Sequence, residues 1–241
     1  MSNVKNIKGN ASHGFKLKID NVKKRAQLDI YGEIGDNIFG DGITLANISE
    51  ELKAIKNVKE IDVRINSMGG DAFQGIAIYN RLKQYDASIK VYVDGIAASA
   101  ASIIAMAGDE IIMGTGSLLM IHSPMTMSFG NQRDLQETIE VLDTVEDQML
   151  DIYQKVTGKD RLELRRLVQD ETWMGADEAI ELGFATQVEE TMPVAACAKS
   201  TLAKFKKVFK NCPTERIVTE TQKVKDDIKN KLKNIEDYLA R

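Results

Sequence analysis

The 241-residue sequence predicts an α/β fold in which short strands alternate with helices. Two stretches carry this prediction: Ile61–Ile65 and Ile89–Val93 alternate as β-branched strands, and each leads through a glycine-containing turn into a helical pattern. Glu110–Met113 and Leu118–Ile121 are two further short apolar runs. In such folds ligands bind at the loops where strands feed helices.

Besides Ile61–Ile65, two strands and two helices are expected before the strand at Ile89–Val93. Phe15–Asp20 and Ala26–Tyr31 alternate as strands. Apolar residues recur at helical spacing over Leu45–Ile55. Asp71–Gln84 has an apolar residue at every third position and is predicted as a helix whose N-terminus faces the preceding glycine loop.

A long amphipathic helix is predicted over Asn131–Val156. Its apolar residues fall three to four positions apart over about 26 residues, which exceeds a typical globular helix. We expect the apolar stripe to be buried at a contact between subunits. Packing within one subunit is the alternative.

Composition excludes several classes of function. The chain is 43% hydrophobic and 28% charged with a pI near 5.4, so it has no overall basic bias toward nucleic acid. It has no apolar run of about 18 residues and no apolar core of a signal peptide, so we expect a cytoplasmic protein that does not enter a membrane. Cys197 and Cys212 lack metal-site or disulfide spacing and are expected to be free thiols.

The C-terminal region differs from the rest of the chain. Lys and Arg outnumber Asp and Glu over Lys199–Arg241, and a helical apolar stripe runs from Val224 to Leu239. We expect a flexible segment over residues 1–24, a catalytic domain over 25–190 and a basic amphipathic helical tail over 191–241. The tail either docks on its own subunit or binds an acidic or scaffold partner.

Ser99 stands between a predicted strand and a predicted helix, with room for a substrate around it. Gly95 permits a tight turn, and the neighbouring alanines leave little side-chain bulk. At the first turn of a helix the Ala100 N–H has no intrahelical acceptor and can meet a negative charge. A tight helix-to-strand contact is the alternative explanation of these small residues.

Two more stretches supply complementary groups. Asn66–Gly70 follows a strand and is predicted as a loop whose paired glycines let a backbone N–H approach a ligand. His122 ends the apolar run Leu118–Ile121, where a general base could be presented. Together with Ser99 these groups favour nucleophilic chemistry over a purely structural role.

Several motifs at fixed offsets resemble one family. Ile65–Gly70 resembles the Asn-Ser-Pro-Gly-Gly loop of the Clp-type serine peptidases, and Gly95–Ser99 resembles their Gly-x-Ala-Ala-Ser turn. Met120–His122 is similar to their histidine strand, and Trp173–Gly183 to their C-terminal helix and glycine. The resemblance covers about residues 27–189 and is closest to the head maturation proteases of tailed phages. Met68 departs from the pattern, since the family has proline there.

The resemblance implies a ClpP/crotonase-like ββα superhelix with a long projecting helix, and a serine endopeptidase. Ser99 would be the nucleophile and His122 the base, with the amides of Gly70 and Ala100 holding the oxyanion. Counting back from the C-terminal helix puts the triad acid on Glu171. Asp170 serves after a shift of one residue.

The implied partners are a protein or peptide substrate, expected to be capsid or scaffold protein, and further copies of the chain in a ring. No cofactor or metal is expected. Because the sequence has no Walker loop, energy-dependent unfolding would need a separate ATPase unfoldase.

Two rival functions remain open: a crotonase-like acyl-CoA enzyme and a noncatalytic assembly subunit. A Ser-Lys peptidase would need a lysine directed at Ser99, whereas Lys83 and Lys90 are predicted at solvent positions. Of the other serines, Ser102 is expected to pack in the core, whereas Ser67 and Ser123 are expected to form loop hydrogen bonds.

Overall fold

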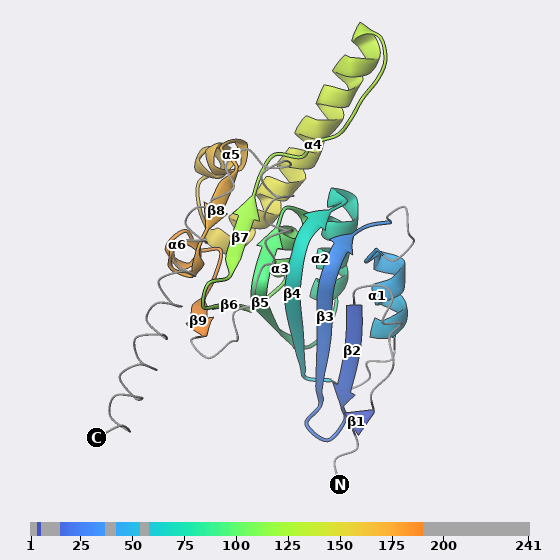
Figure 1. The fold of residues 1–241 in the computed structure, drawn as a ribbon, viewed down its shortest axis with the longest axis vertical. Helices are drawn as coiled ribbons and strands as arrows, with labels where there is room; N and C mark the ends of the chain where they lie inside the picture. Colours follow the sequence, from blue (N-terminus) through green and yellow to red (C-terminus); the bar gives the residue numbers. More distant parts are fainter. Residues whose placement is uncertain (1–3, 6–14, 37–41, 54–57, 190–241) are drawn as a thin grey trace, which may run out of the picture. The chain divides into compact units, whose positions relative to one another are not determined.

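The computed structural model describes residues 4–5, 15–36, 42–53 and 58–189 (Figure 1). The strands are β1 (Val4–Lys5), β2 (Phe15–Asp20), β3 (Arg25–Ile34), β4 (Glu60–Gly70), β5 (Ser88–Ala98), β6 (Glu110–Gly114), β7 (Leu118–Ile121), β8 (Thr172–Met174) and β9 (Gln187–Glu189). The helices are α1 (Leu45–Leu52), α2 (Ala72–Lys83), α3 (Ala100–Ala105), α4 (Gln132–Thr157), α5 (Arg161–Gln169) and α6 (Ala176–Glu181). Within the described residues the strands form one sheet in the order β1-β2-β3-β4-β5-β6-β9, with β7 joined to β5 and β8 joined to β7.

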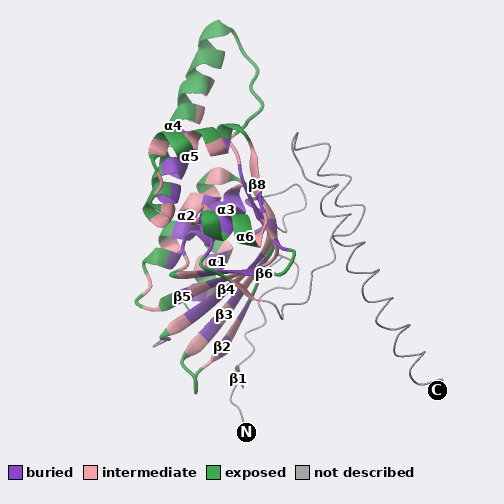
Figure 2. Ribbon diagram, turned by 90° about the vertical axis from the view of Figure 1, so that its left-hand side faces the viewer, coloured by how far each residue is buried: buried purple, intermediate pink, exposed green. Residues whose placement is uncertain are grey.

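One face of the central strands is apolar, and helices cover it. Along β4, Ile61, Val63 and Ile65 are fully buried, whereas Asp62 and Arg64 alternate with them and face the other way. Helices α2 and α3 pack on the apolar face, with α1 beside α2 (Figure 2). The alternating pattern of the sequence therefore becomes a sheet with one face in the core.

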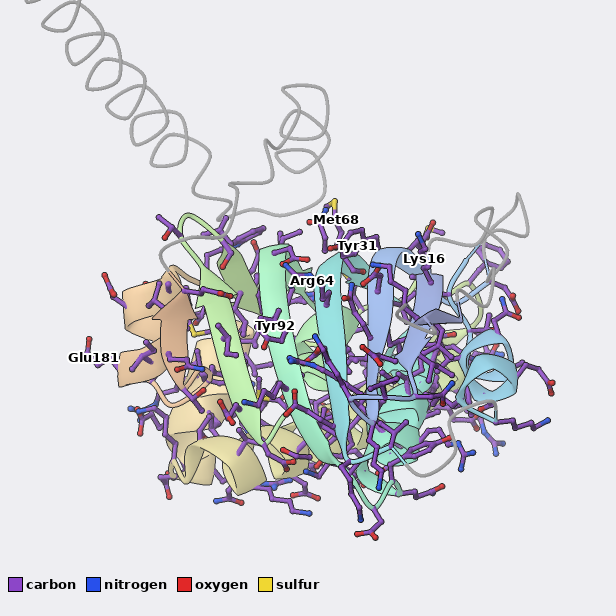
Figure 3. All side chains as sticks on the ribbon, turned by 90° about the horizontal axis from the view of Figure 1, so that it is seen from below. Lys16, Tyr31, Arg64, Met68, Tyr92 and Glu181 are labelled. Carbon is purple, nitrogen blue, oxygen red and sulfur yellow. The ribbon has the colours of Figure 1, made fainter. Side chains whose placement is uncertain are left out.

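The other face carries an ordered polar layer. Asp94 on β5 accepts hydrogen bonds from Arg64 on β4 and from the Tyr31 hydroxyl on β3. The Arg64 guanidinium also lies over the Tyr92 ring, 5.2 Å from its centroid, and Figure 3 shows these side chains together on this face. Burial and the bond to Asp94 raise the pKa of Tyr31 to about 12. These contacts link β3, β4 and β5 just before β4 ends at Gly69 and Gly70.

One edge of strand β5 pairs with β4, and the other edge changes its partner half-way along. Lys90–Val93 pairs with β6, and Ile96–Ala98 pairs with β7, both in parallel. Strand β8 then lies antiparallel to β7. The end of β5, the end of β7 and the start of β8 therefore meet in one region.

Helix α4 is long and only partly packed on the sheet domain. It begins with a capping box between Asn131 and Asp134 and ends at Gly158, whose φ is 68°. All its buried residues lie in the second half, from Val145 to Tyr153. The first half projects past the sheet, and its side chains are largely exposed (Figures 1 and 2). None of the helices in the described residues is long and apolar enough to span a bilayer.

Most expected elements are confirmed, including the helix predicted over Asn131–Val156 and the strand over Phe15–Asp20. Because that strand pairs along its length with β3, the sheet reaches N-terminal of residue 25, where we expected the domain to begin. The loop expected at Asn66–Gly70 is wrong: Gly69 and Gly70 continue β4 by pairing with Glu33 and Ile34. The expected tail over residues 191–241 lies outside the described residues.

Candidate active site

Ser99 occupies a strained bend between β5 and α3. Its φ is 54° and its ψ is −125°, a conformation that costs a residue with a side chain about 1–3 kcal/mol. The bend is held because the Ser99 N–H donates to the Met120 carbonyl oxygen over 2.9 Å. The next amide, that of Ala100, opens the helix and has no intrahelical acceptor.

Small residues allow this bend to be packed. Four neighbouring alanines are buried: Ala97, Ala98, Ala100 and Ala101. Helix α2 approaches so closely that a Cβ at Gly75 would lie 2.9 Å from the Ala100 carbonyl oxygen. The small residues around Ser99 therefore allow both the tight packing of α2 against α3 and the bend that presents the Ser99 side chain.

His122 contacts Ser99 directly. Its Nε2 lies 2.8 Å from the Ser99 Oγ, within hydrogen-bonding distance. The sheet explains the contact: Ala98 on β5 is paired with Met120 on the parallel strand β7, so the residues just beyond both strands emerge together. The serine and histidine that the sequence singled out are brought together.

The β7–β8 pairing selects between the two acids considered for the site. Ile121 is paired with Thr172 in an antiparallel register, so the next positions outward are His122 and Glu171. Asp170 is instead the C-terminal cap of α5. Burial lowers the pKa of His122, and the Glu171 carboxylate opposes that change by raising it. The register and the electrostatics both favour Glu171 as the partner of His122.

Trp173 is a site residue whose role the sequence did not indicate. Its indole Nε1 donates to Glu171 Oε1 over 3.1 Å. The sequence indicates Trp173 only as the start of the motif Trp173–Gly183. Its contact with Glu171 depends on the local course of the backbone at the start of β8, which the sequence pattern does not give. Ser123, beside His122, donates to the buried Glu146 over 2.6 Å, which fixes the chain after the histidine.

The end of β4 lies against the bend. Gly69 has a φ of 94°, and a Cβ there would lie 2.7 Å from Ser99 Cβ and 2.9 Å from the Ala100 nitrogen. Only glycine permits that approach. Ser67 secures the segment, since its Oγ donates to the Gly32 carbonyl and accepts from the Gly69 N–H.

Gly70 follows Gly69 and ends β4. The Asp71 N–H bonds to the Ile34 carbonyl oxygen on β3 over 2.8 Å. Gly70 itself has a φ of 143°, so the backbone departs from a regular strand where β4 ends. The end of β4 and the first amide of α3 therefore meet at the bend, since a Cβ built at Gly69 would lie 2.9 Å from the Ala100 nitrogen. The amides of Gly70 and Ala100 stay the predicted oxyanion donors.

Two other expectations about side chains can be compared with the structure. Lys83 and Lys90 form ion pairs with Asp109 and Glu110, so neither is the partner of Ser99. Ser102 is fully buried as expected, but it also makes two hydrogen bonds, one of them to Tyr153. Sequence spacing gave no signal of that bond, which joins residues 51 positions apart.

A sequence profile described as Clp protease matches residues 18–192. The chain belongs to the Clp protease family. It is 31% identical over 132 residues to the ATP-dependent Clp protease proteolytic subunit of Deinococcus radiodurans, covering 54% of this chain and 65% of that protein. It is 30% identical over 128 residues to proteolytic subunit 1 of Protochlamydia amoebophila, covering 52% and 62%. The aligned part thus spans a little under two thirds of each of these Clp relatives.

A solved structure confirms the fold of this Clp family member. A mutant of ClpP1 from Listeria monocytogenes superposes with a TM-score of 0.59 at 21% identity, covering 68% of this chain and 91% of that one. The α/β fold of ClpP type expected from the sequence is confirmed by the match.

Proposed function

We propose that the chain is a serine-type endopeptidase. The observation that carries the proposal is the 2.8 Å contact between Ser99 Oγ and His122 Nε2 at a strained bend. The amides of Gly70 and Ala100 are the oxyanion donors that we propose beside it. A nucleophile, a base, a group that orients the base and oxyanion donors are the four parts that metal-free peptide hydrolysis requires.

The reaction assigns one role to each part. His122 takes the proton of Ser99 as Oγ attacks the scissile carbonyl carbon, and the Gly70 and Ala100 amides stabilise the developing oxyanion. His122 then gives the proton to the leaving amine, and an acyl-enzyme remains on Ser99. Water, activated by His122, hydrolyses it. Glu171 orients the imidazole and stabilises its charged form.

Covalent labelling tests the proposal. A fluorophosphonate should label the full chain at Ser99, located by peptide mass spectrometry, and Ser99→Ala should abolish both labelling and peptide hydrolysis. Ser117→Ala is the matched control, because Ser117 is a buried serine with no hydrogen-bond partner among the described residues. An unlabelled but folded wild-type protein would contradict the proposal and favour an acyl-CoA enzyme or a noncatalytic subunit.

We further propose capsid or scaffold protein as the substrate, processed in the host cytoplasm during phage head maturation. The support is the resemblance of about residues 27–189 to the Clp-type peptidases, which as a whole is most like the head maturation proteases of tailed phages. Co-expression with the capsid protein, followed by mass spectrometry, should show cleavage that is lost with Ser99→Ala. Intact capsid protein in both cultures would rule out this substrate.

A homo-oligomeric ring is the proposed assembly, with an ATPase unfoldase as a partner for folded substrates. The support is exposed apolar surface on the projecting part of the chain: Met127 and Phe129 are fully exposed, and Leu135, Ile139 and Val141 are 43%, 50% and 55% exposed. Several exposed large apolar side chains on one projecting segment favour a surface that another subunit covers.

A further inference from the structure

Helix α4 reaches the Ser99 bend through two buried hydroxyl groups. Tyr153 on α4 and Ser102 on α3 are both fully buried, and their hydroxyl oxygens are 2.8 Å apart. Ser102 Oγ lies in turn 2.6 Å from the carbonyl oxygen of Ser99. The mechanism above does not use either side chain.

The direction of these hydrogen bonds can be assigned. A carbonyl oxygen can only accept, so the single hydroxyl hydrogen of Ser102 goes to Ser99. The Tyr153 hydroxyl must then donate to Ser102 Oγ. Burial raises the pKa of Tyr153, which keeps the phenol protonated and able to donate.

The Ser99 carbonyl oxygen, which accepts the hydrogen bond from Ser102, belongs to the same peptide unit as the Ala100 N–H. A trans peptide is planar, with its C=O and N–H pointing in opposite directions. Holding the Ser99 carbonyl toward Ser102 and the core therefore turns the Ala100 N–H outward, beside Ser99 Oγ. The backbone bonds from Ser102 and Ile103 to the same carbonyl, at 2.9 and 3.4 Å, act in the same direction.

We propose that Ser102 and Tyr153 are positioning residues that aim the Ala100 N–H at the oxyanion. The inference rests on the proposed function, because it assigns a second layer of residues to the oxyanion site of that peptidase. The two hydrogen bonds hold the Ser99–Ala100 peptide plane. Rotation of this plane would turn the Ala100 N–H away from the oxyanion and would relax the strain at Ser99.

Two variants and two matched controls test the proposal in the full-length protein. Ser102→Ala removes the bond to Ser99, and Tyr153→Phe removes only the donor to Ser102. Ser117→Ala and Tyr85→Phe are the controls, since the Tyr85 hydroxyl bonds to the Leu52 carbonyl oxygen, away from the bend. All four are compared with wild type for thermal unfolding, peptide kcat and KM, and the position of the Ala100 amide resonance.

The expected result is specific to a misdirected oxyanion donor. Ser102→Ala should lower kcat by about 10- to 100-fold with little change in KM, because an oxyanion donor acts mainly in the transition state. Tyr153→Phe should lower kcat less, and the double variant should match Ser102→Ala alone, because Tyr153 acts through Ser102. The pH dependence set by His122 should not move. The Ala100 resonance should shift in both variants and in neither control.

The outcomes separate this inference from the proposed function. Unchanged kcat and an unmoved Ala100 resonance in Tyr153→Phe and Ser102→Ala would overturn the positioning role while the peptidase stands. Equal losses in the controls would overturn it as well, since they would indicate general destabilisation. If wild type is inactive and unlabelled yet the Ala100 resonance moves as expected, the peptidase proposal fails and the aiming of the amide is retained. Should Ser102→Ala not fold, Tyr153→Phe alone decides.

Discussion

Trp173 holds the Glu171 carboxylate by donating its indole N–H to Oε1 over 3.1 Å. The same carboxylate raises the pKa of His122 against the effect of burial. Glu171 thus acts on the imidazole by charge, and Trp173 restrains where that charge lies.

Removing the Glu171 charge should cost more activity than removing that of Asp170. Glu171→Gln should lower kcat by about 100- to 10,000-fold, in the range seen when a triad acid is neutralised. Asp170→Asn should stay within about tenfold of wild type, since Asp170 ends α5. Trp173→Phe should fall between them. Steady-state hydrolysis of a peptide measures all three, and the reverse order of the first two would move the acid to Asp170.

The pH dependence of labelling should report His122 as a base. Only the neutral imidazole accepts the Ser99 proton, and burial lowers the pKa of His122 below its ordinary value of 6.5. The labelling rate should therefore rise with pH through a midpoint below 6.5 and then level off. In Glu171→Gln the midpoint should move to still lower pH, because the charge that raises the pKa is gone. A midpoint that rises in this variant would contradict the assigned interaction.

Gly69→Ala should damage the site from the opposite strand. The added Cβ would lie 2.6 Å from the Ala98 carbonyl oxygen and 2.7 Å from Ser99 Cβ, at a φ that disfavours side chains. We expect a loss of kcat of about 100-fold or more, comparable with losing an oxyanion donor. Gly175→Ala is the control, since nothing lies within 4 Å of a Cβ there. Peptide hydrolysis by Gly69→Ala at the wild-type rate would refute this close approach.

Ser99→Gly should be more stable than Ser99→Ala. Both variants lose the hydroxyl and its contact with His122, but only glycine adopts the φ of 54° without strain. We expect a difference of about 1 kcal/mol in the free energy of unfolding, measured by urea denaturation. Equal midpoints and slopes would show that the bend is not strained.

Replacing Leu135, Ile139 and Val141 together by serine should weaken assembly. These side chains are exposed on the projecting half of α4, and burying them between subunits would contribute to association. Light scattering should show a smaller species than for wild type, with the helix retained by circular dichroism. Glu140→Ala, on the same exposed segment, should assemble normally. An unchanged mass for the triple variant would exclude this segment from the contact.

Local features of the site could be predicted because their causes are local. The small residues around Ser99, the apolar run before His122 and the paired glycines are each short patterns with a direct steric meaning. They single out the serine and the histidine, which the structure brings into contact, and they predict both amides without any knowledge of the register.

The remaining features depend on pairings between distant parts of the chain. The continuation of β4 through Gly70 depends on Ile34, and the choice between Glu171 and Asp170 depends on how β8 aligns with β7. The bond between Tyr153 and Ser102 arises only when α4 packs against α3. Sequence periodicity determines which face of an element is apolar, but not which residue it meets.

The two halves of strand β5 pair with different strands, and this pairing affects how the protein loses activity. The first half is held by β6, the second half by β7, and the amide of Ser99 is itself bonded to Met120. Deuterium should therefore replace the Ser99 amide proton only in openings that dismantle the centre of the sheet. Gradual heating would leave the hydroxyl and imidazole correctly spaced until the domain melts as a whole.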